Sequence, residues 1–231
     1  MFEFLISRSA SLLPQGAGGH LGWLRGAIGG GLAIAVAGLV TMLLLGSNAA
    51  GFPVLYAPMG ASAVLVFAVP ASPLAQPWSV IGGNLLSACI GLAMGHALGM
   101  PVLAGGLAVG AAIAAMSFAR CLHPPGGACA LLCALGASGA EAWGWPIMLA
   151  IMFNVFALAG TGWLYNNLTG HNWPHRPVVP TAPAAGLRHT REDIEAVLAD
   201  WDEVLDIDVD DLDAIYQALQ RRVRARNNRP R

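Results

Sequence analysis

Charge is what this sequence has least of. Only 11% of its 231 residues are charged, whereas charged residues make up about a quarter of a typical soluble domain. Between Gly26 and Gly170 there are two formally charged residues, Arg120 and Glu141. This scarcity excludes a water-soluble domain over that span. Because several of its apolar runs approach the roughly 20 residues that cross a bilayer, we expect residues 26–170 to be embedded in lipid.

Lysine is absent, and all twelve basic residues are arginines, a bias typical of GC-rich bacterial genomes. Cysteine is scarce as well. Cys89, Cys121, Cys129 and Cys133 all lie in the apolar region, and their spacing suits neither a zinc site nor a secreted disulfide framework. We therefore expect the four thiols to serve as small residues in tightly packed membrane helices.

The sequence also lacks the signatures of enzymes and of nucleic-acid-binding proteins. It contains no set of nucleophile, base and orienting residue, no cluster of metal ligands and no nucleotide-binding loop. Its one arginine cluster is terminal. The aromatic residues that a nucleic-acid interface would place between the arginines are absent from this cluster. We expect no enzymatic activity, no metal, no other cofactor and no nucleic-acid partner.

What is present divides the chain into three parts. Residues 1–20 form a short leader, and residues 21–170 form the membrane domain. Residues 171–231 form a polar tail that opens with the Pro-rich linker "HNWPHRPVVPTAPAAG". The predicted fold class is all-α, a polytopic bundle of membrane helices with a short helical cytoplasmic tail.

Four long helices are predicted in the membrane domain, at residues 26–46, 79–99, 101–118 and 146–165, with a tight turn at Met100-Pro101. Two further apolar stretches, 51–70 and 122–138, are interrupted. Pro58 and Pro125 lack an N–H group and cannot sit inside a regular helix without breaking its hydrogen bonds. Neither stretch should therefore form a full, uninterrupted membrane helix.

The two interrupted stretches resemble each other. The first contains "APMGASAVLV" at residues 57–66, and the second contains "PPGGACALLC" at residues 124–133. Each follows a helix containing "GGLA" and precedes a helix with one asparagine. The chain therefore reads as two copies of helix, Pro-Gly segment and helix, with chance similarity in Ala-, Gly- and Leu-rich sequence as the alternative. The alignment pairs Pro58 with Pro125, Gly60 with Gly127, Ala61 with Ala128, and Ser62 with Cys129, and the asparagines of the two following helices are Asn84 and Asn154.

Arginine distribution predicts the topology. Arg8 and Arg25 precede the first helix and the tail is rich in arginine, and arginine in short flanking segments favours the cytoplasm. With both termini cytoplasmic, the number of crossings is even. We favour six crossings, which place Arg120 near the cytoplasm and make the repeats inverted. Four crossings with two re-entrant segments are the alternative and place Arg120 outside. The expected location is a bacterial inner (plasma) membrane.

The Pro-Gly segments are the candidate substrate site. Each looks like a helix that begins inside the membrane, where its free N–H groups and positive dipole end must face protein, a wet cavity or an anion. Two such starts from inverted repeats can meet near the bilayer midplane, with positive charge added by His123 and Arg120. The candidate substrate-binding residues are Pro58, Gly60, Ala61, Ser62, Asn84, Arg120, His123, Pro125, Gly126, Gly127, Cys129 and Asn154.

Purely structural roles are the alternatives for these residues. Close helix packing explains much of the Gly-Ala pattern. Arg120 could extend to the membrane interface, and His123 could cap a neighbouring carbonyl. Asn84 and Asn154 could bridge helices without touching substrate.

The motif "CLHPPGGA", with "HPP" at residues 123–125, resembles the signature of the HPP family of integral membrane proteins. The segments "APMGASAVLVF" and "PASPLAQPWSVIGGN" are also similar to that family, and the likeness covers about residues 20–170. The resemblance implies nitrite transport, with which plant and cyanobacterial members are associated. The family is usually described with four membrane helices, so six crossings depart from that description.

In the tail, Thr190 and Asp193 have the spacing of a helix-capping pair, followed by two short amphipathic helices. Asp206, Asp208 and Asp210 have calcium-loop spacing, but Asp211 replaces the loop glycine and Gln217 the final glutamate, so we expect no calcium site.

Together these patterns predict a membrane transporter or channel for a small inorganic anion. Nitrite as the substrate rests on the resemblance alone. The alternative function is a non-transporting membrane anchor or sensor whose tail recruits a partner. The expected partners are the anion and the lipid bilayer, and a homo-oligomer is left open.

Overall fold

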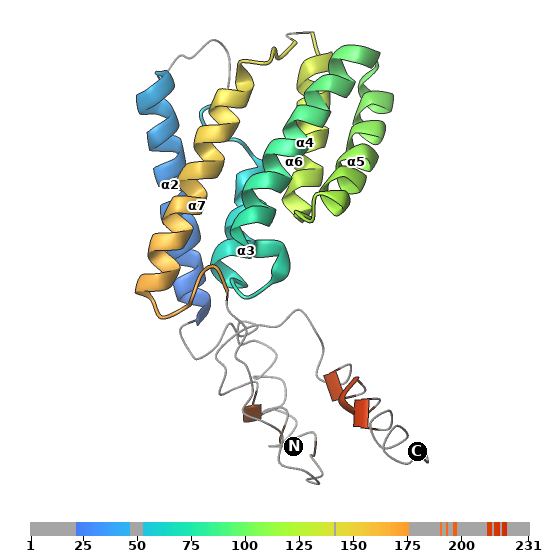
Figure 1. Ribbon diagram of the computed structural model, residues 1–231. Coiled ribbons are helices and arrows are strands. Elements are labelled where there is room, and N and C mark those ends of the chain that lie inside the picture. Colours follow the sequence, from blue (N-terminus) through green and yellow to red (C-terminus); the bar gives the residue numbers. More distant parts are fainter. Residues whose placement is uncertain are drawn as a thin grey trace, which may run out of the picture.

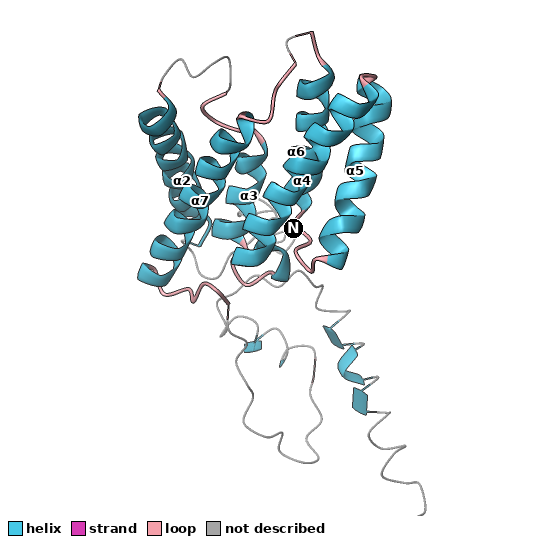
Figure 2. Cartoon of the chain, turned by 45° about the horizontal axis from the view of Figure 1, so that its top comes forward, coloured by secondary structure: helices cyan, strands magenta, loops and turns pink. Residues whose placement is uncertain are grey.

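A computed structural model describes residues 22–46, 53–140 and 142–175, and in the tail positions 190, 193, 196–197, 212–213, 215–217 and 219–220. The leader 1–20, Glu141, the Asp206–Asp210 segment and most of the two predicted tail helices lie outside the described residues. Every regular element in the described part is helical, as the fold class predicted (Figure 2).

Four helices are long and apolar enough to cross a membrane: α2 (Gly22–Leu45), α4 (Pro77–Leu98), α5 (Pro101–Phe118) and α7 (Ile147–Leu168). They confirm the four predicted helices, with ends shifted by a few residues. Two shorter apolar helices, α3 (Pro58–Ala68) and α6 (Pro124–Ser138), complete the bundle, and a 3-10 turn, η1 (Pro73–Ala75), lies between α3 and α4 (Figure 1).

Proline and glycine define the helix ends. A proline occupies the first turn of α3, α4, α5 and α6, where its missing N–H costs nothing and its fixed φ suits the helix. Helix α4 ends at Gly99, which adopts a left-handed conformation with φ 61 and donates its N–H to Gly95 O at 3.0 Å. Pro101 then starts α5, so the predicted turn at Met100-Pro101 is confirmed.

The two short helices cannot span the hydrocarbon by themselves. Helix α3 has 11 residues and α6 has 15, or about 16 and 22 Å at 1.5 Å per residue, against a hydrocarbon core of about 30 Å. The chain reaches α3 through a non-helical segment at residues 53–57. Both interrupted stretches are therefore partly non-helical, as expected from Pro58 and Pro125.

The six helices nevertheless alternate in direction. Helix α2 runs antiparallel to α7, because Arg25 contacts Asn166 at one end and Thr41 contacts Asn154 nearer the other. Helices α4 and α6 run parallel, with Gly83 beside His123 and Gly95 beside Ala137. In Figure 1, α2, α4 and α6 rise where α3, α5 and α7 descend. The chain thus passes through the bundle six times, and the four-pass arrangement with re-entrant segments does not describe it.

This alternation makes the two proposed repeats inverted. Helices α2, α3 and α4 correspond in order to α5, α6 and α7, and each helix runs opposite to its counterpart (Figure 1). Within each repeat the short, proline-led helix packs against the helix before it, so that Gly30 of α2 meets Ala63 and Gly105 of α5 meets Leu131. The sequence similarity therefore corresponds to a similarity in spatial arrangement.

Small residues bring α4 and α6 into close contact. A Cβ atom added at Gly95 would lie 2.6 Å from Ala134 O and 2.6 Å from the Cβ of Ala137. Backbones approach this closely only where side chains are absent or small. The α4–α6 pair forms the centre of the bundle, with α5 on one side and α2 and α7 on the other (Figure 1).

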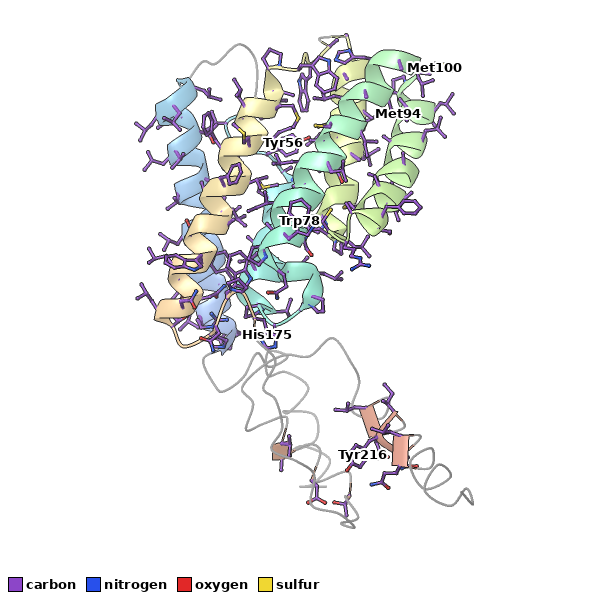
Figure 3. All side chains as sticks on the ribbon, viewed as in Figure 1. Tyr56, Trp78, Met94, Met100, His175 and Tyr216 are labelled. Atoms are coloured by element: carbon purple, nitrogen blue, oxygen red, sulfur yellow. The ribbon has the colours of Figure 1, made fainter. Side chains whose placement is uncertain are left out.

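The segment after α7 returns to the bundle. Trp173 is 2% exposed, and its Nε1–H donates to Ala75 O at 3.0 Å. Asn167 fixes the return by donating to Trp173 O at 2.7 Å. The sequence placed residues 171–175 in a linker, but here they pack on the membrane bundle because a buried tryptophan supplies a large apolar surface. Figure 3 shows His175 at the base of the bundle, where this segment ends.

In the tail, the capping pair predicted at Thr190 and Asp193 is confirmed. The Thr190 N–H donates to Asp193 Oδ2 at 2.7 Å, and the Asp193 N–H donates to Thr190 Oγ1 at 3.3 Å. These reciprocal bonds satisfy two backbone donors at a helix start.

Candidate functional site

His123 lies at the centre of the candidate site. It precedes Pro124, which restricts it to extended backbone, with φ −144 and ψ 110 at the N-cap of α6. Its side chain is fully buried. The ring Nδ1 lies 2.7 Å from Leu74 O in η1, and Nε2 lies 2.8 Å from Ser62 Oγ in α3. One imidazole therefore joins the start of α6 to two other elements.

Asn84 of α4 extends this contact. Its Nδ2 donates to Ser62 Oγ at 3.1 Å and to Val80 O, one turn back in its own helix, at 2.9 Å. Ser62 and Asn84 are both fully buried. We refer to His123, Ser62 and Asn84 as the buried triad. It joins α3, α4 and α6 where the two short helices lie side by side.

The hydrogen-bond partners determine the tautomer of His123. A backbone carbonyl can only accept, so the Nδ1 beside Leu74 O carries the proton. In the neutral ring Nε2 is then an acceptor, and the Ser62 hydroxyl donates to it. Ser62 Oγ in turn accepts from Asn84. The buried triad is thus an ordered chain of donors and acceptors with no net charge.

Glycines make room for this arrangement. A Cβ atom at Gly83 would lie 2.6 Å from the Cβ of His123, and one at Gly126 would lie 2.8 Å from both Ser87 Oγ and Met116 Sδ. Gly126 therefore brings the start of α6 against the Ser87 hydroxyl. Ser87 donates to Met116 Sδ at 3.4 Å, a weak acceptor. The sequence reading missed Ser87, since nothing in its neighbourhood distinguishes it from other small residues.

Asn154 lies in α7, the counterpart of α4 in the second repeat, but makes other contacts. Its Oδ1 accepts from the Tyr56 N–H at 3.3 Å, and its Nδ2 donates to Thr41 Oγ1 at 2.9 Å and Val54 O at 3.0 Å. It also donates to Ala150 O at 2.9 Å. Asn154 thus joins α7 to α2 and to the segment before α3, and lies apart from the buried triad.

Tyr56 is a second buried residue that the sequence reading missed. Its hydroxyl donates to Cys129 O at 3.3 Å and lies 2.7 Å from Cys133 Sγ. The Cys129 thiol donates to Asn84 O at 3.3 Å. Cys129 therefore lies between Tyr56 and Asn84, and Figure 3 shows Tyr56 inside the bundle.

The sequence predicted free N–H groups at the starts of α3 and α6, but the first N–H groups of both helices are hydrogen-bonded. Met59 N–H donates to Tyr56 O at 2.9 Å, Gly60 N–H to Ala57 O at 3.0 Å, and Gly126 N–H to His123 O at 2.8 Å. These turn hydrogen bonds satisfy the first donors locally. Moreover, α3 and α6 pass each other side by side, so the two helix starts do not meet end to end.

The other predicted residues divide into buried and exposed groups. Pro58, Pro125 and Gly126 are buried, and Gly127 is partly exposed. Gly60 and Ala61 are exposed on α3. Arg120 is exposed at the turn between α5 and α6, with φ 54. Its surroundings therefore differ from those of fully buried His123, and a joint contribution of the two side chains to an anion site stays a prediction.

Arg25 takes part in a polar cluster at the end of the bundle where α2 begins. Its Nη1 donates to Asn166 Oδ1 at 2.8 Å and its Nη2 to Phe67 O at 3.0 Å, while Asn166 Nδ2 donates to Val66 O at 3.0 Å. The cluster joins α2, α3 and α7. The sequence reading used Arg25 only for topology and gave Asn166 no role.

Comparison with known proteins identifies the family. The model of the family described as "HPP, transmembrane region" matches residues 16–174, a span that includes every residue of the buried triad. The chain belongs to the HPP family. The resemblance inferred from "CLHPPGGA" is therefore confirmed, and His123, Pro124 and Pro125 of this HPP protein form the start of α6.

The curated relatives of this HPP protein are named only as transmembrane proteins. One from Dictyostelium discoideum is 47% identical over 87 residues, which is 36% of this chain and 30% of the relative. A second from the same organism is 42% identical over 101 residues, or 42% of this chain and 29% of the relative. The matched region thus spans less than a third of either relative. No solved structure matches this chain.

Proposed function

We propose that this HPP protein is a transporter or channel for a small inorganic anion, and that the anion is nitrite. The substrate passes where α3, α4 and α6 meet, next to the buried triad. Nitrite follows from the family resemblance, and the geometry contributes the chemistry of a small, polar site in an apolar bundle.

The observation that carries the proposal is the buried triad itself. Polar groups inside a membrane domain are costly unless paired, and ionisable ones mark functional sites by default. His123 and Asn84 are both fully buried among apolar helices. A membrane anchor needs no buried imidazole and no helices interrupted at its centre, so these features favour transport over the anchor hypothesis.

The surroundings of the α6 start suit an anion, through the helix dipole and the Ser87 hydroxyl of α4. Its N-terminal end carries the positive end of the helix dipole. The Ser87 hydroxyl lies against Gly126, and it donates only to a thioether among the described contacts. An anion oxygen is a better acceptor than that sulfur. The close packing around Gly83 and Gly126 suits a small ion, which enters when the helices separate.

Both ends of the membrane domain face the cytoplasm in this proposal, and the membrane is a bacterial inner membrane. The orientation rests on arginines such as Arg8 and Arg25 that precede the first helix. The α5–α6 turn with Arg120 then also faces the cytoplasm, because Trp78 at the start of α4 donates to Ala119 O and holds the two at one end of the bundle.

Uptake into proteoliposomes tests the proposal. Purified protein should carry nitrite faster than protein-free vesicles, in a panel that includes nitrate, formate and chloride. Ser87→Ala should lower uptake, whereas Ser138→Ala should not, because the Ser138 hydroxyl bonds to Ala134 O and Leu135 O within the far end of α6. If no anion in the panel enters faster than in protein-free vesicles, the proposed function is wrong.

A further inference from the structure

One buried acceptor in the triad has no partner. Asn84 Oδ1 lies in a fully buried side chain and accepts no hydrogen bond from any described residue. The amide cannot be turned to remove this deficit, because Oδ1 would then face Val80 O, another acceptor, at the 2.9 Å now spanned by Nδ2. The position calls for a donor, and an anion supplies none.

The second repeat shows that the architecture can satisfy such an atom. When Pro58 is aligned with Pro125, Tyr56 corresponds to His123, and Asn154 lies three residues beyond the position that corresponds to Asn84. Asn154 Oδ1 accepts the Tyr56 N–H at 3.3 Å. Asn84 Oδ1 has no such bond. The unpaired acceptor is therefore a particular feature of the repeat half that holds His123.

A count of donors and acceptors identifies what is missing. In the neutral triad the donors are the His123 Nδ1–H, the Ser62 hydroxyl and the two Asn84 Nδ2 protons. The acceptors are Leu74 O, His123 Nε2, Ser62 Oγ, Val80 O and Asn84 Oδ1. There is one acceptor more than there are donors. A proton on Nε2 turns that acceptor into a donor, and Ser62 Oγ, which has two lone pairs, can then accept from both His123 and Asn84 while its hydroxyl proton is released for Asn84 Oδ1. All five donors then have a partner, and so has Asn84 Oδ1.

We propose that the buried triad is a proton-binding site and that this HPP protein carries its anion together with a proton. A proton from a hydronium ion bonds to the lone pair of His123 Nε2, which then donates to Ser62 Oγ. The Ser62 hydroxyl turns to Asn84 Oδ1, and the amide tilts towards Ser62 so that Oδ1 accepts this proton while Nδ2 stays on the side of Val80 O and Ser62 Oγ. Release to water on the other side reverses these steps.

The protonated triad needs a counter-charge, and the anion supplies it. The described elements packed against His123 are α3, η1, α4 and the end of α5. None carries an acidic side chain, and the titratable groups nearby are the thiols of Cys121 and Cys129. Arg120, three residues upstream, is exposed and of like charge.

A desolvated imidazolium is costly without a partner charge. Proton and anion should therefore strengthen each other's binding reciprocally. This step rests on the proposed anion transport.

Nitrogen NMR of the ring tests proton binding directly. The full chain, labelled with 15N-histidine in lipid nanodiscs, contains six histidines, and His123→Gln assigns the His123 signals by difference. At neutral pH we expect the Nδ1–H tautomer. On acidification Nε2 should gain a proton, at a higher pH when nitrite is present. Asn84→Leu should weaken proton binding about tenfold, one pH unit, because the final acceptor is lost. Ser138→Ala should leave the titration unchanged.

Flux measurements then test coupling. In proteoliposomes near neutral pH that contain a pH-sensitive dye, inward nitrite flux should acidify the lumen beyond the protein-free control, and an acidic exterior should drive accumulation. If nitrite enters without protons, the coupling is wrong while the proposed transport stands. If no anion enters at all, the proposed transport fails, and the NMR titration still decides the proton site. A His123 ring that keeps Nε2 unprotonated across the pH range of the folded protein overturns the proposal.

Discussion

The Ser62 hydroxyl oxygen lies 2.8 Å from Nε2 of His123, although 61 residues separate the two along the chain. Ser62 belongs to the short helix of the first repeat, and His123 begins the short helix of the second. The contact therefore ties the two inverted repeats together inside the membrane. Any movement that separates α3 from α6 has to break it, so the contact is a place to test the proposed transport.

The two asparagines of the corresponding helices should differ in their importance for stability. Asn154→Leu leaves the buried Tyr56 N–H and Val54 O without their partner, and each such loss costs about 1–3 kcal/mol. Asn84→Leu removes an acceptor that is already unpaired, and with it the Nδ2 bonds to Val80 O, inside α4, and to Ser62 Oγ, which keeps its bond to His123. The leucine has a similar volume. We expect a much larger drop in apparent Tm for Asn154→Leu, measured by thermal unfolding in detergent. Equal drops would contradict the unpaired state of Asn84 Oδ1.

His123 and Arg120 should differ in transport. His123→Ala removes the ring that joins three elements of the site, and one hydrogen bond to a charged group is worth about 1.5–3 kcal/mol, or roughly a tenfold loss of nitrite uptake or more. Arg120→Gln changes an exposed side chain, and we expect less than about a twofold change. Both variants should be assayed at matched protein content and with retained Tm. If Arg120→Gln lowered nitrite uptake as much as His123→Ala does, Arg120 would have to be counted among the substrate-binding residues.

Glycines at the two helix starts should not respond alike. An added Cβ at Gly60 or Gly127 meets nothing within 4 Å, whereas one at Gly126 meets Ser87 Oγ at 2.8 Å and Gly83 O at 3.0 Å. Gly60→Ala and Gly127→Ala should raise stability by about 0.4–1 kcal/mol. Gly126→Ala should lower both apparent Tm and uptake, since α4 and α6 must move apart. A tolerated Gly126→Ala would show that this close approach is unnecessary.

Single cysteines test the topology. In a background without the four native cysteines, Ala119→Cys and Gly139→Cys place exposed thiols at opposite ends of the bundle. Ala119→Cys should react with membrane-impermeant reagent from the cytoplasmic side and Gly139→Cys from the other side. Labelling of both thiols from one side would rule out six alternating passes.

Much of the fold was predictable because its signals are local. The near absence of charge between Gly26 and Gly170 indicates the membrane. Gly99 and Pro101 indicate a turn, because glycine tolerates a left-handed backbone conformation and proline has a fixed φ. Pro58 and Pro125 predict interrupted helices for the same reason. The alignment around these prolines also predicted the inverted repeat, since similar segments adopt similar local structure wherever they occur.

The composition of the site was only partly predictable. His123, Ser62 and Asn84 were among the candidates, but so were exposed Arg120 and Gly60, and Tyr56 and Ser87 were missed. Trp173 was assigned to a linker. In each case the missing information is the neighbour across the helix interface. These membrane helices are apolar on all sides, so no polar face in the sequence indicates which side is buried.

The sequence by itself determined that this protein is a helical membrane protein of the HPP family, with two proline-led short helices and a histidine before one of them. Only the tertiary structure decided that Ser62 and Asn84 meet His123 and that Asn84 Oδ1 is left without a donor. The physical reason is that proline and hydropathy act within a few residues along the chain, whereas a hydrogen bond between helices depends on their rotation and register. Those are set by close packing at glycines such as Gly83 and Gly126, which only the assembled bundle defines.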